Sequence, residues 1–445
     1  MSIRNTITEK IVLPLSDFVL DQSVSKHFRF LQKSQWWSKV EINEYQNKKL
    51  RELIKHAYEN VPYYTELFDS LSLTPNDIKT TKDITKLPIL TKEIVRENMK
   101  NGKLIAKNIS KRKMILNGSS GSTGEPLQYY ISKEAYSFNI AANLRGWYWM
   151  GYRLGDKYTK LSQNPRNGIV KKSQDWINNC YYTVSQSLSK QDISNIVAEL
   201  VKNNVTVIRG YPSTIYILAN YIFDEGINGF SNLKAIATTG EILFPYMRKK
   251  IESVFNCKIF DAYSGEGGAV VFECETHEKY HLTAEYAYTE FVRNHSYNME
   301  VGSGEIISTD FWNFAVPFIR YNSKDVAIMS DENCSCERGL PVLSKIEGRD
   351  VDILTTPSGK SLIVHYFTGY FEWITSVVQF QIIQYEQNKI VLKLVPNDLF
   401  NEKEKDKIFN DMSVYIGDDV FFSIEIVDNI PVNPKNGKRK FVLKK

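Results

Sequence analysis

The sequence predicts an α/β protein with a large N-terminal domain of layered sheets and helices, residues 1–348, and a small α+β C-terminal domain, residues 349–445. Helical and strand-like segments alternate from residue 185 to residue 262, which is typical of a layered sheet. After Arg349 the pattern changes to β-rich segments around one helix, and about a hundred residues is a common domain size. The 445 residues, 42% of them apolar, are also enough for more than one core.

Apolar periodicity and turn residues define the individual elements. Helices show apolar residues every three to four positions, and strands show short β-branched runs. Thr91 is the predicted N-cap of one helix. The predicted helices are Leu50–Tyr58, Lys82–Arg96 with a turn at Leu87-Pro88, Ile193–Val201, Ser213–Ile222, Tyr246–Val254 and, in the small domain, Glu402–Tyr415. The predicted strand regions are Met114–Leu116, Leu127–Ile131, Val205–Ile208, Ala235–Thr238, Lys258–Ala262, Glu305–Ser308, Phe318–Tyr321, Ile382–Val395 and Phe421–Val427.

Charge and hydropathy exclude several classes of protein. The net charge of +5 is small for the chain length and is dense only near the C-terminus, so we expect no nucleic-acid partner. No segment reaches the roughly 20 apolar residues of a membrane-spanning helix, and no signal peptide is recognisable. Five cysteines are few for a secreted protein of this size. We therefore expect a cytoplasmic protein without a membrane span.

A stretch between two predicted strands, Asn117–Pro126, is dense in Gly, Ser and Thr. Glycines let a backbone fold tightly around an anion, and hydroxyl and N–H groups then donate to phosphate oxygens. The stretch is not a Walker loop, because no Gly-Lys-Ser/Thr follows it. By composition it also fits a flexible surface loop. The candidate phosphate-binding residues are Ser119, Ser120, Gly121, Ser122, Thr123 and Gly124.

Five further positions can carry nucleotide chemistry. Tyr263 and Glu266 follow a strand, where a ring can stack on a base and a carboxylate can hold Mg²⁺. Asp325 is predicted at a strand end, where its carboxylate can accept two ribose hydroxyls. Arg349 lies at the domain boundary, and Lys438 lies on a glycine-containing loop where its ammonium can reach phosphate. Taken singly, these positions also fit a turn, a hairpin, a linker and a solvated basic tail.

Taken in order, the motifs resemble those of the adenylate-forming superfamily, in the branch of the phenylacetate–coenzyme A ligases and CapK-like capsule biosynthesis proteins. The resemblance runs from about Arg51 to the C-terminus. It implies that the C-terminal domain is mobile and that the chain is an AMP-forming acid–thiol ligase. The stretches typical of the branch are His56–Tyr64, Leu87–Lys92, Thr239-Gly240-Glu241, Cys334-Ser335-Cys336 and Ile346–Arg349.

The resemblance also implies how ATP is held. The loop from Ser119 to Gly124 is expected to wrap its β- and γ-phosphates, and Glu266 is expected to hold Mg²⁺. Tyr263 is expected near adenine, although it stands one place later than the family's aromatic residue. Asp325 is expected to bind the ribose hydroxyls.

The remaining implied roles concern the acyl pocket and the hinge. Thr239, Gly240 and Glu241 are expected to form part of the adenine and acyl pocket. Arg349 is expected near the ribose and the hinge, for which Asp352 is a candidate pivot. Lys438 is expected between the substrate carboxylate and the α-phosphate, where its charge stabilises the transition state of adenylation. Rotation of the small domain then removes Lys438 so that an acceptor can attack.

Three cysteines and a histidine predict a metal site. Cys274, His281, Cys334 and Cys336 form a Cys₃His set, which suits a closed, structural tetrahedral Zn²⁺. Similar arrangements in the branch make His281 the preferred fourth ligand, with His277 as the alternative. The same residues also fit three reduced buried cysteines beside a surface histidine.

Three functional hypotheses follow. The first is ATP-dependent activation of a carboxylic acid to an acyl-adenylate, with release of pyrophosphate and transfer to coenzyme A. The second keeps adenylation but transfers the acyl or aminoacyl group to a non-CoA acceptor in capsule or surface-polysaccharide biosynthesis. The third is a nucleotide-binding assembly partner without catalysis, against which the intact motifs argue. The acid's identity and the oligomeric state, including a homodimer, are left open.

Overall fold

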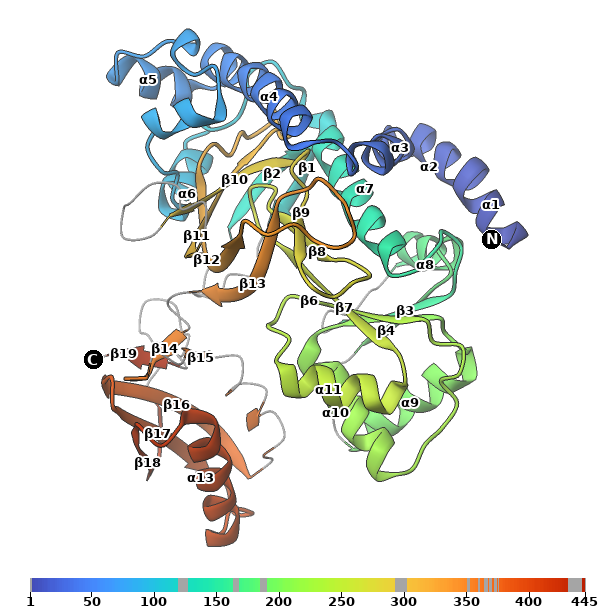
Figure 1. Ribbon diagram of the computed structural model, residues 1–445, viewed down its shortest axis with the longest axis vertical. Helices are drawn as coiled ribbons and strands as arrows, with labels where there is room; N and C mark the ends of the chain where they lie inside the picture. Colours follow the sequence, from blue (N-terminus) through green and yellow to red (C-terminus); the bar gives the residue numbers. More distant parts are fainter. Residues whose placement is uncertain are drawn as a thin grey trace. The chain divides into compact units, whose positions relative to one another are not determined.

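A computed structural model describes most of the chain, and its residues divide into two compact units at Glu347/Gly348 (Figure 1). None of the helices in the described part is both long and apolar enough to cross a membrane. The described residues are 2–118, 127–162, 168–184, 190–292, 302–349, 353–358, 361–363, 367, 370–371, 374, 376–430 and 442–444.

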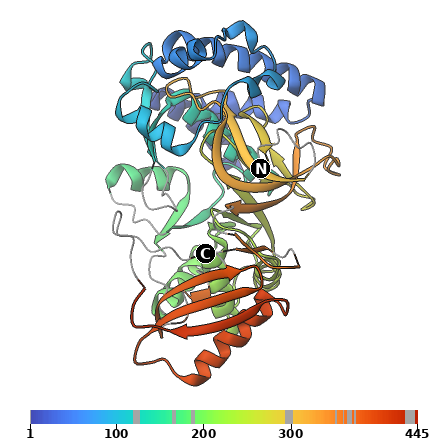
Figure 2. The ribbon, with the colours of Figure 1, turned by 90° about the vertical axis from the view of Figure 1, so that its left-hand side faces the viewer.

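Helices make up the first hundred residues and gather at one end of the large unit (Figures 1 and 2). The longest, α4, begins at Ser38, whose hydroxyl accepts from the Glu41 N–H while the Glu41 carboxylate accepts from the Ser38 N–H. It ends before Pro62, and Thr91 caps α6 as predicted. These elements are α1 Ile3–Ile7, the π-helical turn η1 Thr8–Val12, α2 Leu13–Leu20, α3 Val24–Ser34, α4 Lys39–Asn60, α5 Pro62–Ser70, the 3₁₀ turns η2 Pro75–Asp77 and η3 Thr81–Lys86, and α6 Lys92–Lys100.

An 11-stranded mixed sheet forms the centre of the large unit, in the order β10-β11-β12-β13-β9-β8-β7-β6-β5-β3-β4. Strands β4, β3, β5, β6 and β7 are parallel neighbours. Helix α7 packs on one face, where Gly146 leaves room for the Phe272 ring. The parallel part contains β3 Tyr158–Ser162, α8 Ile169–Ile177, β4 Cys180–Val184, α9 Lys190–Asn203, β5 Val207–Gly210, α10 Pro212–Asp224, β6 Ala235–Thr239, α11 Pro245–Phe255 and β7 Lys258–Ser264, and α7 is Lys133–Trp149.

Antiparallel strands continue the sheet beyond β7. The prediction of a strand over Phe318–Tyr321 was wrong for its first three residues, since β12 begins only at Tyr321. Arg320 has φ +56°, a left-handed conformation that interrupts an extended chain, and its buried guanidinium is held by Glu290 at 2.9 Å. These strands are β8 Val270–Glu273, β9 Tyr280–Leu282, β10 Ala287–Val292, β11 Gly302–Asp310, β12 Tyr321–Ser330 and β13 Val342–Arg349; the short turn η4 Lys111–Lys113 and hairpin β1 Met114–Gly118 and β2 Gln128–Ser132 stand apart.

The small unit is an α+β fold of its own, as the sequence predicts. Its four-stranded sheet has the order β18-β17-β16-β19, and α13 packs against one face through Ile408 and Met412 (Figure 2). Asn401 caps α13 by accepting from the Glu404 N–H at 3.1 Å. The elements are β14 Ile353–Thr355, β15 Ser361–Ile363, β16 Val377–Glu386, β17 Lys389–Pro396, α13 Glu402–Ile416, β18 Phe421–Ile426 and β19 Val442–Lys444.

Candidate functional site

The carboxyl ends of β5, β6 and β7 lie at one edge of the parallel sheet, which we call the carboxyl edge. Ligands of open α/β sheets bind at such edges. Thr239 ends β6, and Gly240 follows with φ +81°. A Cβ atom at Gly240 would lie 2.6 Å from Tyr211 Cε1, in the residue that follows β5. A side chain at Gly240 is therefore excluded, and the Tyr211 ring closes over this turn.

Two predicted nucleotide-binding residues meet although 62 positions separate them. Tyr263 Oη, at the end of β7, donates to Asp325 Oδ2 at 2.6 Å. Strands β7 and β12 are not neighbours in the sheet, so the antiparallel part curls back toward β7. Burial and the negative Asp325 raise the pKa of Tyr263, so its hydroxyl stays protonated and keeps donating. Asp325 lies inside β12, which corrects its predicted position at a strand end.

Glu266, the predicted Mg²⁺ ligand, is close to this pair. Its backbone carbonyl accepts from Ser308 Oγ at 3.4 Å. Burial raises the pKa of Tyr129, and the negative charges of Glu266 and Asp310 raise it further, which places both carboxyl groups near its hydroxyl. Three carboxyl groups, those of Asp325, Glu266 and Asp310, and the two phenols of Tyr263 and Tyr129 thus gather beside the carboxyl edge.

Asp310 was not recognised from the sequence. It is 4% exposed, and burial raises its pKa to about 7 although the N–H groups of Trp312 and Asn313 lower it. Its Oδ1 accepts from those N–H groups at 2.8 and 3.1 Å. It ends β11 and stands two residues after the predicted strand Glu305–Ser308, but its burial depends on packing against Gly268, which follows β7.

Arg209 is a second residue that the sequence analysis missed. It lies near the carboxyl end of β5, with its guanidinium 5.3 Å from the Trp147 ring centre. Burial lowers its pKa, and the charges that oppose this come from Tyr158, Cys180 and Tyr211 rather than from a carboxylate. Within the described residues, this guanidinium has aromatic and thiol neighbours but no ion-pair partner. The sequence signal that could have identified Arg209 was an arginine directly after a predicted strand and directly before Gly210-Tyr211.

Glu241 directly follows Gly240 and is partly buried, whereas most of the remaining predicted site residues lie beyond what the structure describes. The loop from Ser119 to Gly124, the hinge candidate Asp352 and the predicted catalytic Lys438 are outside the described residues. Arg349 ends β13, and only its backbone is described.

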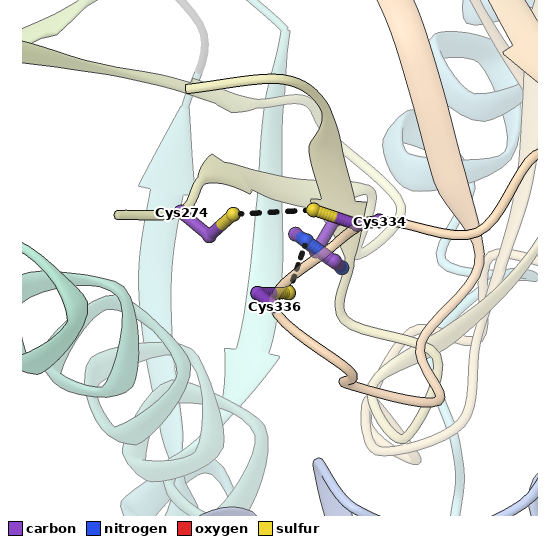
Figure 3. Close-up of side chains that lie close together, drawn as sticks. Cys274, Cys334 and Cys336 are labelled. Carbon is purple, nitrogen blue, oxygen red and sulfur yellow. Dashed lines mark hydrogen bonds between the residues drawn. The ribbon is translucent and has the colours of Figure 1, made fainter. Parts of the chain in front are cut away.

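A separate cluster contains the predicted metal ligands Cys274, His281, Cys334 and Cys336, which we call the thiol–imidazole cluster (Figure 3). All four ligand atoms lie within 4.8 Å of one another. The Sγ atoms of Cys274 and Cys334 are 3.6 Å apart, and Cys336 Sγ lies 3.3 Å from His281 Nε2. Zn–S bonds of about 2.3 Å and Zn–N bonds of about 2.0 Å in a tetrahedron give edges of roughly 3.5–3.8 Å. The separations of 3.6 and 3.3 Å are close to these edges, so the donor set fits a tetrahedral metal site.

Local structure explains which histidine joins the cluster. His281 lies on β9 with its Nε2 toward the cysteines, and burial and the nearby Arg338 lower its pKa to about 4, so its ring is neutral at pH 7. His277 instead adopts φ +58° and directs Nδ1 toward Glu273 at 3.5 Å. The alternative ligand His277 is thus absent from the group of donors that the described residues bring together.

The cluster also ties the end of α3 to the loop between β12 and β13. Gln35 Oε1 accepts from Trp149 Nε1 at 2.8 Å and from Arg338 Nε at 3.1 Å. The Arg338 guanidinium lies 4.5 Å from the Trp149 ring centre, and Trp149 in turn packs on His281. These contacts embed the cluster in the core of the large unit.

Comparisons with known proteins agree with this fold. Protein CapK of Staphylococcus aureus is 26% identical over 426 residues, which cover 91% of this chain and 89% of CapK. The phenylacetate-coenzyme A ligase of Aromatoleum evansii is 24% identical over 329 residues, covering 71% and 72%. The crystal structure of 2-hydroxyisobutyryl-CoA ligase in the postadenylation state, in complex with R3-HIB-AMP, has a TM-score of 0.69 at 17% identity and covers 93% of both chains. A family profile described as the CapK C-terminal domain matches residues 354–445.

The fold is that of a solved acyl-CoA ligase, and the homology to coenzyme A ligases supports the class of adenylate-forming, AMP-forming ligases. Within that class the chain is a homologue of CapK and of the phenylacetate–coenzyme A ligases, and it ends in a CapK C-terminal domain. The predicted fold class and the predicted resemblance are both confirmed.

Proposed function

We propose that this chain activates a carboxylic acid with ATP and then transfers the acyl group to coenzyme A. A carboxylate oxygen attacks the α-phosphorus, the bond to the β-phosphate bridging oxygen breaks, and pyrophosphate leaves. The coenzyme A sulfur then attacks the acyl carbon, and AMP leaves with the bonding electron pair. Because this reaction consumes ATP, we also propose a cytoplasmic location.

The observation that carries this proposal is the meeting of Tyr263, Asp325 and Glu266 beside the carboxyl edge, in a fold that covers 93% of 2-hydroxyisobutyryl-CoA ligase. The Asp325 carboxylate would accept hydrogen bonds from the ribose hydroxyls, and the Tyr263 hydroxyl would hold that carboxylate in position. Glu266 would hold Mg²⁺ on the phosphates, since carboxylate oxygens suit that ion. Thr239, Gly240 and Glu241 would form part of the adenine and acyl pocket, under the Tyr211 ring.

Charge neutralisation would come from residues outside the described part. Negative charge builds up on the phosphates as pyrophosphate leaves, and a positioned lysine and loop N–H groups stabilise it. We assign these roles to Lys438 and to the loop from Ser119 to Gly124, with Arg349 near the ribose. We assign Arg209 to contact with an anionic group of the acid or of the adenylate, because its guanidinium has no carboxylate neighbour in the described structure.

The thiol–imidazole cluster would hold one structural Zn²⁺. Four protein donors fill the tetrahedral positions of the ion, so none is left for substrate. The ion would fix the ends of β8 and β9 and the loop that precedes β13.

Pyrophosphate exchange into ATP across a panel of carboxylic acids tests the proposal. We expect exchange with at least one acid, and formation of a thioester when coenzyme A is added. A second candidate acceptor is an amine, a hydroxyl or a carrier-protein thiol in capsule or surface-polysaccharide biosynthesis. Exchange without a thioester would favour that acceptor, and no exchange with any acid would refute adenylation.

A further inference from the structure

Residues Ile3–Leu20 form one rod whose apolar side faces away from the protein. The junctions between α1, η1 and α2 keep right-handed helical dihedral angles at Ile7 and Val12, so helix runs without a break from Ile3 to Leu20. We call this segment the N-terminal rod; it is drawn in dark blue at the rim of the large unit (Figure 1). At 1.5 Å per residue it is about 27 Å long.

The residues that the rod buries are polar. Asn5 Nδ2 donates to Leu154 O and to Asp156 Oδ1, both at 2.9 Å. Thr8 packs against Gly155, where an added Cβ would lie 2.8 Å from Thr8 Oγ1. The Asp17 carboxylate accepts from the N–H groups of the first two α3 residues, at 3.0 and 2.7 Å. Specific hydrogen bonds therefore fix which side of the rod faces the protein.

The residues that the rod exposes are apolar. Ile3 is 82% exposed and Phe18 is 87% exposed, values far above those of ordinary core-facing helix positions. The spacing of three and four residues places these side chains along one side of the helix. We call this side the apolar ridge, and it consists of Ile3, Ile7, Ile11, Leu15 and Phe18. A contiguous apolar ridge held outward by a polar attachment indicates a surface that contacts something other than this unit.

The charges near the apolar ridge indicate what kind of partner this surface binds. Residues 1–40 contain six Lys or Arg and three acidic residues. All three acids are engaged, since Glu9 accepts from Tyr148 Oη at 2.8 Å, Asp17 caps α3 and Asp21 pairs with Lys133 at 3.2 Å. Exposed basic residues at three- and four-residue spacing follow on α3, at Lys26, Arg29 and Lys33. The N-terminal helices thus present apolar side chains together with an excess of basic over acidic side chains.

We propose that the N-terminal rod binds the surface of an anionic lipid bilayer, with the apolar ridge in the interfacial region and the α3 cations at the headgroups. Helices with exposed apolar sides and nearby cations bind such interfaces. A second copy of this chain fits less well, because two-fold pairing would bring two basic surfaces together. The exposed Trp36, at 55%, adds an aromatic side chain of the kind enriched at bilayer interfaces.

Sedimentation of the full chain with lipid vesicles tests the proposal. We expect the wild type to bind phosphatidylcholine vesicles that contain phosphatidylglycerol, to bind pure phosphatidylcholine vesicles weakly, and to be released as salt rises. The double variant Ile11→Ser/Phe18→Ser should lower the partition coefficient at least tenfold. A matched double variant of exposed apolar residues elsewhere, Leu399→Ser/Val414→Ser, should bind like the wild type.

A second variant keeps the test decisive if the ridge variant folds poorly. Lys26→Glu/Arg29→Glu/Lys33→Glu leaves the ridge intact and should remove the preference for phosphatidylglycerol. Wild-type protein that stays in the supernatant with both vesicles would overturn the proposal, as would ridge and charge variants that bind normally. Light scattering tests the alternative partner, a second copy of this chain. If the wild type is a dimer and Ile11→Ser/Phe18→Ser is a monomer, the apolar ridge contacts a second copy, and the lipid proposal is overturned.

Discussion

The carboxyl edge and the thiol–imidazole cluster differ in how complete they are. The cluster brings four donor atoms within 4.8 Å of one another, which fills a tetrahedral shell. At the carboxyl edge, Tyr263, Asp325 and Glu266 lie close together, and under the proposed function they would form only part of a nucleotide site. A closed donor set serves folding, whereas an open set of acceptors and donors leaves positions for substrate. Substitutions in the two regions should therefore affect different quantities.

The largest effect is expected for loss of a cluster thiolate. Cys334→Ser should abolish binding of about one zinc per chain and lower the free energy of unfolding by on the order of 3–5 kcal/mol, because a buried charged centre loses a ligand. Native mass spectrometry and thermal unfolding measure both changes. Cys257→Ser is the matched control, since that half-buried thiol lies outside the cluster. Wild-type protein that binds no zinc would contradict the assignment.

A comparable effect, on catalysis rather than stability, is expected at the carboxyl edge. Asp325→Asn should lower kcat/KM for ATP in pyrophosphate exchange by about 10²–10³-fold, as for loss of a preorganised polar contact. Tyr263→Phe should cost about tenfold, since a hydrogen bond to a charged group is lost. Asp331→Asn, at an exposed position just after β12, is the control. Equal losses in all three variants would show that the edge has no special role.

The buried carboxyl of Asp310 predicts a dependence of stability on pH. Its folded pKa of about 7 lies above the usual value, so the folded state holds a proton that the unfolded state loses. Stability from this group is therefore full below about pH 4 and falls as pH rises to about 7, by a few kcal/mol. Asp310→Asn should remove this decline, seen as the difference between variant and wild type in urea unfolding at pH 5 and pH 8. The control variant Asp224→Asn should lose as much stability between pH 5 and pH 8 as the wild type does.

The smallest effect is expected at the Gly240 turn. Gly240→Ala combines a positive φ with a clash against Tyr211 and should cost about 1–3 kcal/mol of stability. It should also raise KM for ATP or the acid, because the turn lies at the carboxyl edge. Gly226→Ala isolates the clash, since Gly226 also has positive φ but nothing within 4 Å of an added Cβ. Identical behaviour of the two variants would remove Tyr211 from the pocket.

Local signals predicted much of the fold. The Thr91 cap and the helix Glu402–Tyr415 were predicted because caps and helical periodicity depend on residues a few positions apart, whereas the start of α4 at the Ser38 cap was missed. The strand over Phe318–Tyr321 was wrong because a tertiary ion pair from Arg320 overrides the apolar pattern there. Sequence reasoning likewise missed Arg209 and Asp310, whose burial comes from distant elements.

By itself, the sequence determined the class of the protein, the order of its elements and the residue types at the candidate sites, since these depend on composition and local spacing. Only the tertiary structure decided that Tyr263 donates to Asp325 and that the N-terminal rod turns its apolar side outward. The physical reason is that a contact between distant residues depends on how the sheet curls and packs. A short sequence pattern records which side of a helix is apolar but not which side faces the protein.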